Sequence, residues 1–326
     1  QPSADSEASV AAGTEKPVVT TFLGSRGVPE ALRVVDDRGV LQQGSVPSFA
    51  SAEEAVRALA KVVEYADWRE RPAGEVPDLD DVDEAVARMI AANVLAQVPE
   101  GRALTTDELT DLLAAYGIEL YPMVPATTVE DAVAAGERLN WNVALKARAS
   151  HLKNRADLAD VWRNIDSAAE MRDAWATMTG SFAGAAEAEY VVQPMAASGV
   201  PVAMRAVEDP SYGPVLSFGV GGVATEVLGD RSYRIPPLTD VDAVEMVREV
   251  KAAPLLLGFD GSDPADLSAI EDLLHRLSRL TDDVPELVEV ELNPVLVRTE
   301  GMAVVNASAR VAPARSRADW YTRRLT

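Results

Sequence analysis

The sequence contains no cysteine and only two histidines, His151 and His275. Without cysteine the chain can form no disulfide, use no thiolate nucleophile and offer no sulfur ligand to zinc. Two histidines are also too few for a metal site built from several imidazoles. These absences exclude disulfide-rich scaffolds, cysteine enzymes and zinc fingers, and they favour a cytoplasmic location, which we expect for this protein.

Long apolar runs and positive charge are scarce as well. No stretch approaches the roughly 18 residues of a membrane-spanning helix, and no signal peptide is visible. The 30 lysines and arginines are outnumbered by 52 aspartates and glutamates, which gives a formal net charge of −22. Such a chain repels a phosphate backbone at long range. We therefore expect neither nucleic acid nor a membrane as partner, whereas a small anion could bind where positive charge is concentrated.

The 326 residues are enough for two or more domains. Residues 1–16 lack a periodic apolar pattern, and we expect them to be disordered. In 17–72, strands at 17–24 and 45–49 and a helix at 52–68 alternate as in an α/β domain. So few strands cannot close a core. We therefore interpret 17–72 as the last part of an α/β domain whose beginning lies outside the chain.

The helix expected at 52–68 begins at a capping pair, Ser51 with Glu54, and carries an apolar stripe. The stripe consists of Val56, Leu59, Val62 and Val63. A linker rich in proline and aspartate follows at 73–83.

Helices and strands alternate again from 104 to 178. Three capping pairs predict helix starts: Thr105 with Glu108, Thr127 with Glu130, and Ser167 with Glu170. Strands are expected at 118–121 and 143–149. Beyond 188, short apolar segments between turn residues predict an antiparallel sheet, with strands at 189–195, 201–207, 213–219 and 224–228.

The remaining elements are two helices, a hairpin and a tail. We expect the helices at 241–251 and from Pro264 onward, with Pro264 in the first helical position. Residues 288–297 and 303–306 are expected to pair as a hairpin, and 312–326 form a basic tail.

The segment 288–297, VEVELNPVLV, can carry chemistry. Read as a strand, it has an apolar face with Val288, Val290 and Leu292 and a polar face with Glu289, Glu291 and Asn293. Pro294 is expected to interrupt the ladder. Carboxylate and carboxamide oxygens are ligands that Mg²⁺ accepts beside phosphates. The pattern alone fits both a solvated acidic edge strand and a metal site.

Positive charge gathers around a lysine in an apolar strand. Lys146 lies in VALKARA, and Arg148, Lys153 and Arg155 follow shortly after it. This segment is either a solvated basic loop or an anion site, and His151 is near enough to approach the same ligand.

Two further features favour structural roles. His275 flanks the apolar stripe of its expected helix. The glycine-rich segment 218–226 precedes a strand rather than opening a helix, so it favours a tight turn over a dinucleotide fingerprint.

Several motifs occur in an order that resembles a known family. They are LLAAYGI, VALK, VVQPM, DPSYGPVLSFGVGG, YRIPPL, APLL and ELNPVLV, spread over about residues 85–310. In this order they resemble the ATP-grasp subunit of ADP-forming acyl-CoA synthetases. Residues 17–72 resemble the last part of the succinyl-CoA-synthetase-like ligase domain that precedes it in fused proteins. KPVVTTFLG, DLADVWRNI and GDRSYRIPPLTDVDA look most like actinobacterial proteins in which this region is fused to a GNAT lysine acetyltransferase domain.

The resemblance implies an α/β and α+β fold. We expect a partial flavodoxin-like α/β domain at 17–72, followed by a two-lobe ATP-grasp domain at 84–311 with ATP between the lobes. The expected cofactors are ATP and Mg²⁺, with CoA or acyl-CoA as a further ligand. The expected partners are the N-terminal remainder of the ligase region, a GNAT domain and further copies of the chain.

The resemblance also implies the site residues. By position, Lys146 would contact the ATP phosphates, and Gln193 and Met195 would lie on the adenine hinge. Mg²⁺ would be held by Glu291, Asn293 and Asn306.

The sequence departs from the family pattern at several of these places. Asn154 stands at the position of a family histidine, and asparagine cannot accept a phosphoryl group as imidazole does, so we assign no catalytic residue. Pro194 replaces a hinge glutamate and has no N–H to donate. Asn306 replaces an aspartate beside the metal. The remaining departures are Ala156 for a serine, Ala159 and Asp160 for a glycine pair, and Pro201 for an acidic residue.

Two hypotheses follow from these observations. In the first, the chain is a degenerate acyl-CoA-synthetase module that binds nucleotide or acyl-CoA as a regulatory or assembly part of a protein lysine acetyltransferase. In the second, it belongs to an active ligase that converts ATP, CoA and a short carboxylic acid to acyl-CoA, ADP and phosphate. The second hypothesis rests on Lys146, Glu291 and Asn293.

Overall fold

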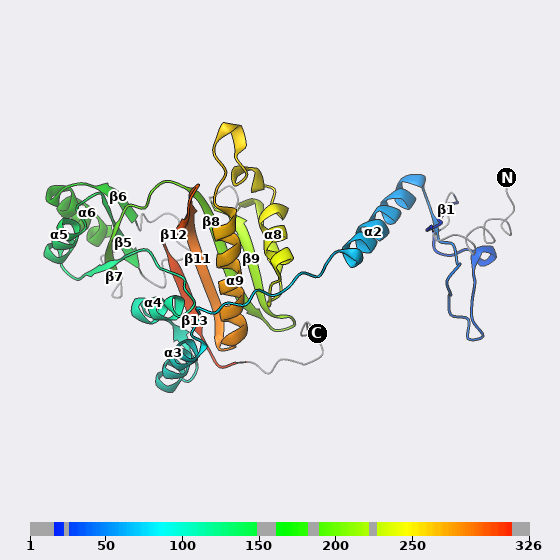
Figure 1. Cartoon of the computed structure of the whole chain (residues 1–326), viewed down its shortest axis with the longest axis horizontal. Coiled ribbons are helices and arrows are strands. Elements are labelled where there is room, and N and C mark those ends of the chain that lie inside the picture. Colours follow the sequence, from blue (N-terminus) through cyan, green and yellow to red (C-terminus); the bar gives the residue numbers. More distant parts are fainter. Residues whose placement is uncertain (1–15, 23–25, 149–160, 182–188, 222–226, 315–326) are drawn as a thin grey trace. The chain divides into compact units, whose positions relative to one another are not determined.

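The computed structural model describes residues 16–22, 26–148, 161–181, 189–221 and 227–314. It forms two compact units, Gln1–Ala73 and Gly74–Thr326 (Figure 1). In these ranges, no helix is both long and apolar enough to cross a membrane.

The first unit contains a small parallel sheet and one long helix. β1 (Thr20–Thr21) pairs with β2 (Ser48–Phe49), the 3-10 helix η1 (Glu30–Leu32) lies between them in the chain, and α2 (Ala52–Glu70) follows β2. The Ser51 hydroxyl accepts the Glu54 N–H at 3.2 Å, so the helix starts where its capping pair predicts. The strands are shorter than expected because the parallel pairing covers only two residues of each.

Three of the four residues in the apolar stripe of α2 lie on the surface of this unit, whereas Leu59 is half-buried. Val56 is 65% exposed, Val62 53% and Val63 49%, and the buried residue of the helix is Ala55. A surface helix normally packs such a stripe against a core. The described part of the first unit does not provide a core for it.

The second unit contains two sheets, and the smaller one has the strand order β4–β7–β5–β6. Its strands are antiparallel, and α5 and α6 cover one face, where Leu145 and Val192 pack with Met171. The elements are β4 (Val124–Ala126), α5 (Val129–Arg138), β5 (Val143–Arg148), β6 (Val161–Ile165), α6 (Ala168–Ser181) and β7 (Glu189–Pro194).

The larger sheet has the order β10–β9–β8–β11–β13–β3, with β12 pairing to β11. Its strands are β3 (Arg102–Ala103), β8 (Val200–Asp209), β9 (Gly213–Val220), β10 (Ser232–Arg234), β11 (Leu287–Val297), β12 (Met302–Val304) and β13 (Ala307–Val311). The helices of this part are α3 (Glu84–Gln97), α4 (Thr106–Ala114), α8 (Asp240–Glu249), η3 (Ala253–Leu255), η4 (Phe259–Gly261) and α9 (Leu267–Asp283).

Alternating side chains place one face of the larger sheet in the main core. Met204, Phe218 and Leu292 from the strands pack with Leu274 and Leu277 of α9. Figure 1 shows α8 and α9 side by side along the strands of this sheet. The polar residues of the same strands therefore lie on the opposite face.

Residues 75–83, expected as part of a linker, contact this unit. The backbone of Glu75 exchanges two hydrogen bonds with Asp240 at the start of α8, both at 2.9 Å. Arg276 of α9 binds Asp81 at 2.9 Å. These contacts hold the segment against α8 and α9.

Several strands differ from the sequence-based expectation. The sequence did not predict β6, β10 and β13, which are short and carry polar residues. The expected strand 118–121 forms only the isolated bridge between Leu120 and Val304, and β4 follows it. Of the expected strand 224–228, only Val227 and Leu228 are described, and both are helical.

Two helix starts were also predicted wrongly. α5 is capped by Thr128, whose hydroxyl accepts the Asp131 N–H at 3.1 Å, one residue later than expected. α9 begins after Asp266, whose carboxylate accepts the Ala269 N–H at 3.0 Å, so Pro264 precedes the helix. In both cases the side chain that reaches the free N–H groups decides the start.

The strand β11 continues through Pro294, contrary to expectation. The pairing with β8 shifts between Leu292 and Val295, so a bulge takes up the proline. A second shift, between Leu287 and Glu289, buries Leu287 and leaves Val288 only half-buried. The predicted hairpin is confirmed, because β12 pairs with β11.

Candidate functional site

The two sheets of the second unit are joined at the end of β7 by the side chain of Gln193. This residue is only 1% exposed, and its Nε2 donates to the carbonyl oxygens of Tyr121 at 3.2 Å and Val305 at 3.1 Å. Val305 lies between β12 and β13 of the larger sheet. The Gln193 amide therefore has a structural role, and its N–H groups point to protein carbonyls.

The expected hinge has few free main-chain donors. The Met195 N–H donates to the Asn142 carbonyl at 2.9 Å. Pro194 has no N–H. The Met195 carbonyl accepts a long 3.5 Å hydrogen bond from the Tyr121 hydroxyl. Residues 194 and 195 thus offer an adenine no free main-chain N–H in this arrangement.

The three residues expected to hold Mg²⁺ lie together. Asn293 Nδ2 donates to Glu291 Oε1 at 3.2 Å, and Asn306 Nδ2 donates to the Asn293 carbonyl at 3.0 Å. The Asn293 N–H in turn donates to the Asn306 carbonyl at 2.9 Å. Glu291 and Asn293 are brought together by strand β11, whereas Asn306 comes from the turn between β12 and β13. This group lies next to Val305 and so beside the Gln193 contact.

The donor set of this group contains one carboxylate and two carboxamides. Among the described residues, no cluster of three or more acidic, histidine or cysteine side chains could hold a metal ion. Mg²⁺ is commonly bound through one or two carboxylates plus substrate phosphates. The residues therefore fit an ion that arrives with phosphate oxygens, and they do not fit an ion held by protein ligands alone.

Lys146 lies on β5, opposite Val161 of β6 and Val191 of β7. Two residues earlier, Ala144 pairs with Gln193, so Lys146 and Gln193 lie on the same face of the smaller sheet. Helices α5 and α6 pack on the other face, beside Leu145. The half-buried lysine is thus on the face opposite α5 and α6, which also carries the end of β7.

A band of polar residues crosses the face of the larger sheet opposite α9, and the sequence analysis did not identify it. The register places Arg205 of β8 between Ser217 of β9 and Glu291 of β11. Arg205 binds Glu289 Oε1 through Nη2 at 3.0 Å and Nε at 3.3 Å. The alternation of Met204 and Ala206 with Arg205 is the sequence signal that would have assigned this arginine to the face of Glu291.

The glycines of 218–226 have structural roles where they are described. A Cβ on Gly219 would lie 2.9 Å from the Asp230 carbonyl oxygen, and one on Gly221 would lie 3.1 Å from Pro201 Cβ. Close approach of the chain to itself therefore explains both residues; Gly219 lies within strand β9, and residues 222–226 lie outside the described residues, so the expected tight turn stays a prediction.

Several expected site residues lie outside the described residues. They are His151, Lys153, Asn154, Arg155, Ala156, Ala159 and Asp160. The remaining histidine, His275, lies on α9, where burial lowers its pKa despite the nearby carboxylates of Asp272 and Asp240.

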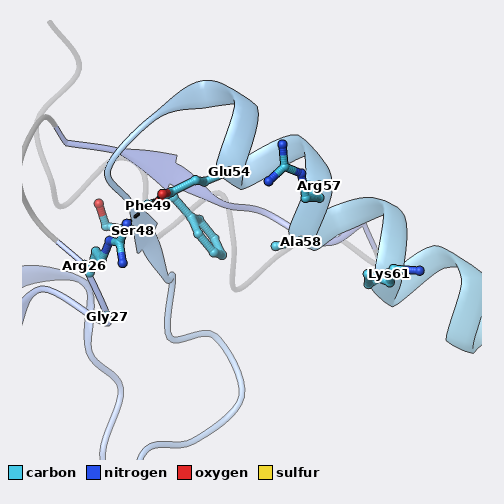
Figure 2. Close-up of a pocket in the computed structure, with 8 residues that line it drawn as sticks. All are labelled: Arg26, Gly27, Ser48, Phe49, Glu54, Arg57, Ala58 and Lys61. Atoms are coloured by element: carbon cyan, nitrogen blue, oxygen red, sulfur yellow. Dashed lines mark hydrogen bonds and ion pairs between the residues drawn. The ribbon is translucent and has the colours of Figure 1, made fainter.

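The first unit contains an open groove of about 450 Å³ between β2 and α2 (Figure 2). Arg26, Arg57 and Lys61 line it, but each binds a carboxylate: Glu54 at 2.7 Å, Glu53 at 2.6 Å and Glu64 at 2.6 Å, respectively. Because these cations are paired, the groove has no concentrated positive charge.

A family model of the ATP-grasp domain matches residues 95–311. The chain is 34% identical over 296 residues to acetate–CoA ligase [ADP-forming] I of Archaeoglobus fulgidus, which covers 89% of this chain and 42% of that protein. It is 35% identical over 231 residues to acetate–CoA ligase [ADP-forming] II subunit beta of Pyrococcus furiosus, covering 69% of this chain and 97% of the subunit. The chain thus spans less than half the length of the longer relative.

Solved structures show the same fold. A dinucleotide-forming acetyl-coenzyme A synthetase 1 of Ca. Korarchaeum cryptofilum, in complex with coenzyme A and Ca-AMPCP, is 31% identical with a TM-score of 0.63, covering 69% of this chain and 99% of that one. PH1788 from Pyrococcus horikoshii Ot3 is 30% identical, also with a TM-score of 0.63, over 72% of this chain and 100% of the other. The expected mixed α/β fold with an ATP-grasp domain is confirmed. The chain therefore belongs to the ATP-grasp family, as a module of the kind found in ADP-forming acetyl-CoA synthetase-like proteins.

Proposed function

We propose that this ATP-grasp module is catalytically degenerate and that it still binds a nucleotide or acyl-CoA. The hydrogen bond from Asn306 Nδ2 to the Asn293 carbonyl carries the proposal. A carboxylate, as in the family pattern, could not donate this hydrogen bond and would instead offer a charged ligand to Mg²⁺. Here the Asn306 side chain binds the neighbouring Asn293 carbonyl and contributes no charge to the site.

The hinge supports the same proposal. An adenine would have to displace the Asn142 carbonyl from the Met195 N–H before it could use that donor. Pro194 offers no substitute. We therefore expect a nucleotide to bind more weakly than in a site whose donors are free.

The ligands are proposed from the relatives. Structures of the Korarchaeum synthetase are described as complexes with coenzyme A and Ca-AMPCP, and with coenzyme A and Mg-AMPPCP. By analogy we propose ATP with Mg²⁺, and CoA or acyl-CoA, as ligands of this chain. Glu291 and Asn293 would hold the ion, which would bridge and neutralise phosphate oxygens, and Lys146 would contact the phosphates.

We further propose that the module is a regulatory or assembly part of a cytoplasmic protein lysine acetyltransferase. The resemblance of KPVVTTFLG and GDRSYRIPPLTDVDA to proteins fused to a GNAT domain supports this. Acetyl transfer from acetyl-CoA to a lysine peptide, assayed with the full-length protein, tests it. Transfer that responds to ATP is expected, and absence of any transfer would reject the association.

The exposed stripe of α2 supports a partner for the first unit. We propose that the N-terminal remainder of the ligase region covers Val56, Val62 and Val63, whether it is in the same polypeptide or a separate subunit. Further copies of the chain are the second proposed partner. Analytical ultracentrifugation with and without the complementing segment distinguishes the two.

Calorimetry and an ADP-release assay test the central proposal. We expect saturable binding of Mg·ATP or acetyl-CoA, but no ADP release when acetate and CoA are added. Lys146→Ala is expected to weaken Mg·ATP binding by about tenfold, the order of one charge-assisted contact. Lys251→Ala, which removes an exposed lysine of the same unit, is the matched control.

An active ligase is the alternative, and the retained group of Lys146, Glu291 and Asn293 favours it. ADP release that depends on both a short carboxylic acid and CoA, measured with the full-length protein, would establish this alternative and reject degeneracy.

A further inference from the structure

The polar face of the larger sheet carries balanced charge beside the expected metal ligands. Glu289 and Glu291 lie on β11, Arg205 lies opposite Glu291 on β8, and Arg310 lies opposite Glu289 on β13. Directly opposed residues in an antiparallel pair project from the same face. Two carboxylates and two guanidinium groups therefore share this face, and their charges cancel.

The guanidinium of Arg205 is held at the edge of this group by Glu289. Its Nη2 and Nε both contact Glu289 Oε1, and its side chain is 42% exposed. In the described part of the chain, its Nη1 has no hydrogen-bond partner. Arg205 is also in register with Glu291, the carboxylate of the expected magnesium site.

This arrangement changes which ligand the face attracts. A divalent cation is repelled by a guanidinium next to a donor set with a single carboxylate. A phosphate is attracted, because guanidinium groups bind phosphate oxygens with two parallel N–H donors. The ion pair with Glu289 is partly exposed and contributes little, so Arg205 can turn toward an incoming phosphate.

We propose that Arg205 binds the phosphates of a nucleoside di- or triphosphate. Its guanidinium neutralises part of the phosphate charge that Mg²⁺ would otherwise neutralise, so that nucleotide binding depends only weakly on the metal. This rests on the proposed function, because it assumes that a nucleotide binds beside Glu291 and Asn293. The fixed backbone supports the role: the Ser217 hydroxyl donates to the Arg205 carbonyl at 3.1 Å, and β8 is paired on both sides.

Calorimetric titration of the chain with ATP, in Mg²⁺ and in EDTA, tests the proposal. For the wild type we expect the Kd to change by less than about threefold between the two conditions. For Arg205→Met we expect a loss of about tenfold or more in EDTA, the order of one charge-assisted contact, and a smaller loss in Mg²⁺. Arg248→Met is the matched control, because Arg248 is 46% exposed and paired with Glu271, on the helices behind the sheet.

Glu289→Gln provides a second variant that leaves Arg205 in place. It removes the competing carboxylate, so ATP binding in EDTA is expected to strengthen by a few fold. Wild-type binding that is lost in EDTA, or Arg205→Met binding equal to wild type, would overturn the role of Arg205 while leaving the proposed function intact. Failure of ATP to bind in either condition would reject both the role of Arg205 and nucleotide binding at this site.

Discussion

At the residue scale, the side chain of Asn306 has a structural role in the hydrogen bonds around Asn293. Its carboxamide donates to the Asn293 carbonyl, and the Asn293 N–H donates back to the Asn306 carbonyl. The two residues are therefore joined by a reciprocal pair of hydrogen bonds. A carboxylate at 306 would break one of these bonds and place negative charge beside Glu291.

Asn306→Asp is expected to lower the stability of the chain and to raise the affinity of the site for Mg²⁺. Losing the hydrogen bond and facing the Asn293 carbonyl should lower the free energy of unfolding by about 1 kcal/mol. The added charge should strengthen Mg²⁺-dependent ATP binding by about tenfold, because a second carboxylate completes a common magnesium donor set. Urea unfolding and calorimetry measure the two effects. An unchanged Mg²⁺ dependence would show that Asn306 does not limit the metal site.

The burial of His275 predicts that the stability of the second unit depends on pH. Its Nδ1 is buried without a hydrogen-bond partner within the described residues. Burial lowers its pKa below 6.5, although Asp272, Asp240, Glu271 and Asp242 act in the opposite direction. Protonation therefore favours the unfolded chain, and this contribution to stability is complete above about pH 6.5 and is lost as the pH falls below it.

His275→Gln is expected to flatten the pH dependence of urea unfolding around pH 6.5, the unperturbed value for histidine. The wild-type chain, measured in parallel, supplies the reference slope. If the variant retains the full slope, titration of His275 does not cause it.

At the scale of single residues, the sequence predicted the proximity of Glu291 and Asn293 but not the contacts of Gln193. Glu291 and Asn293 are two residues apart on one strand, so alternation alone places them together. The hydrogen bonds of Gln193 reach Tyr121 and Val305, which are distant in sequence. A sequence pattern contains no information on such partners, so the structural use of the Gln193 amide could not be predicted.

Among the elements, α4 has the best-defined start. Thr105 and Glu108 form a reciprocal capping box, as their spacing predicts. Two nitrogens of Arg102 also bind the Glu108 carboxylate, both at 2.7 Å. These hydrogen bonds from Arg102, followed by those from Thr105, lower the pKa of Glu108 to about 2 against a cost of burial.

Glu108→Gln is expected to cost about 1–2 kcal/mol at neutral pH, because it weakens the cap and removes the charge that Arg102 binds. The stability that Glu108 supplies is present above its unfolded pKa of 4.5 and is lost as the pH falls toward 2. Acid unfolding of the variant should therefore be less steep in this range. Glu130→Gln, an exposed first-turn residue of α5 outside the cap, should behave as wild type.

A helix or strand could be predicted when the contacts that form it join residues close together in the sequence. The cap of α4 is made by residues three apart, so sequence reading found it. Strands β10 and β13 exist because β9 and β11 offer them edges to pair with. The run through Pro294 depends on a bulge against β8, which is distant in sequence. Such elements are decided by tertiary pairing rather than by their own composition.

At the scale of the whole molecule, the two units differ in how they use apolar residues. The second unit has a continuous core in which Leu273, Leu274 and Leu277 of α9 are at most 1% exposed. In the first unit, Val56, Val62 and Val63 of α2 are exposed, and Trp68 is 62% exposed. Folding of a small segment needs buried apolar area to offset chain entropy. We therefore expect the first unit to depend on a covering partner.

A matched pair of substitutions tests this dependence. Val62→Lys should change the free energy of unfolding of this chain by less than about 0.5 kcal/mol, because the residue is already solvated. Leu277→Ala, in the buried core, should cost about 2–5 kcal/mol. Hydrogen exchange on the unmodified chain should show weak protection for α2 and strong protection for α9. Addition of the complementing ligase segment should protect α2 in the wild type, whereas Val62→Lys should prevent that protection because it places a charge in the apolar contact. Strong protection of α2 without any partner would show that the first unit folds on its own.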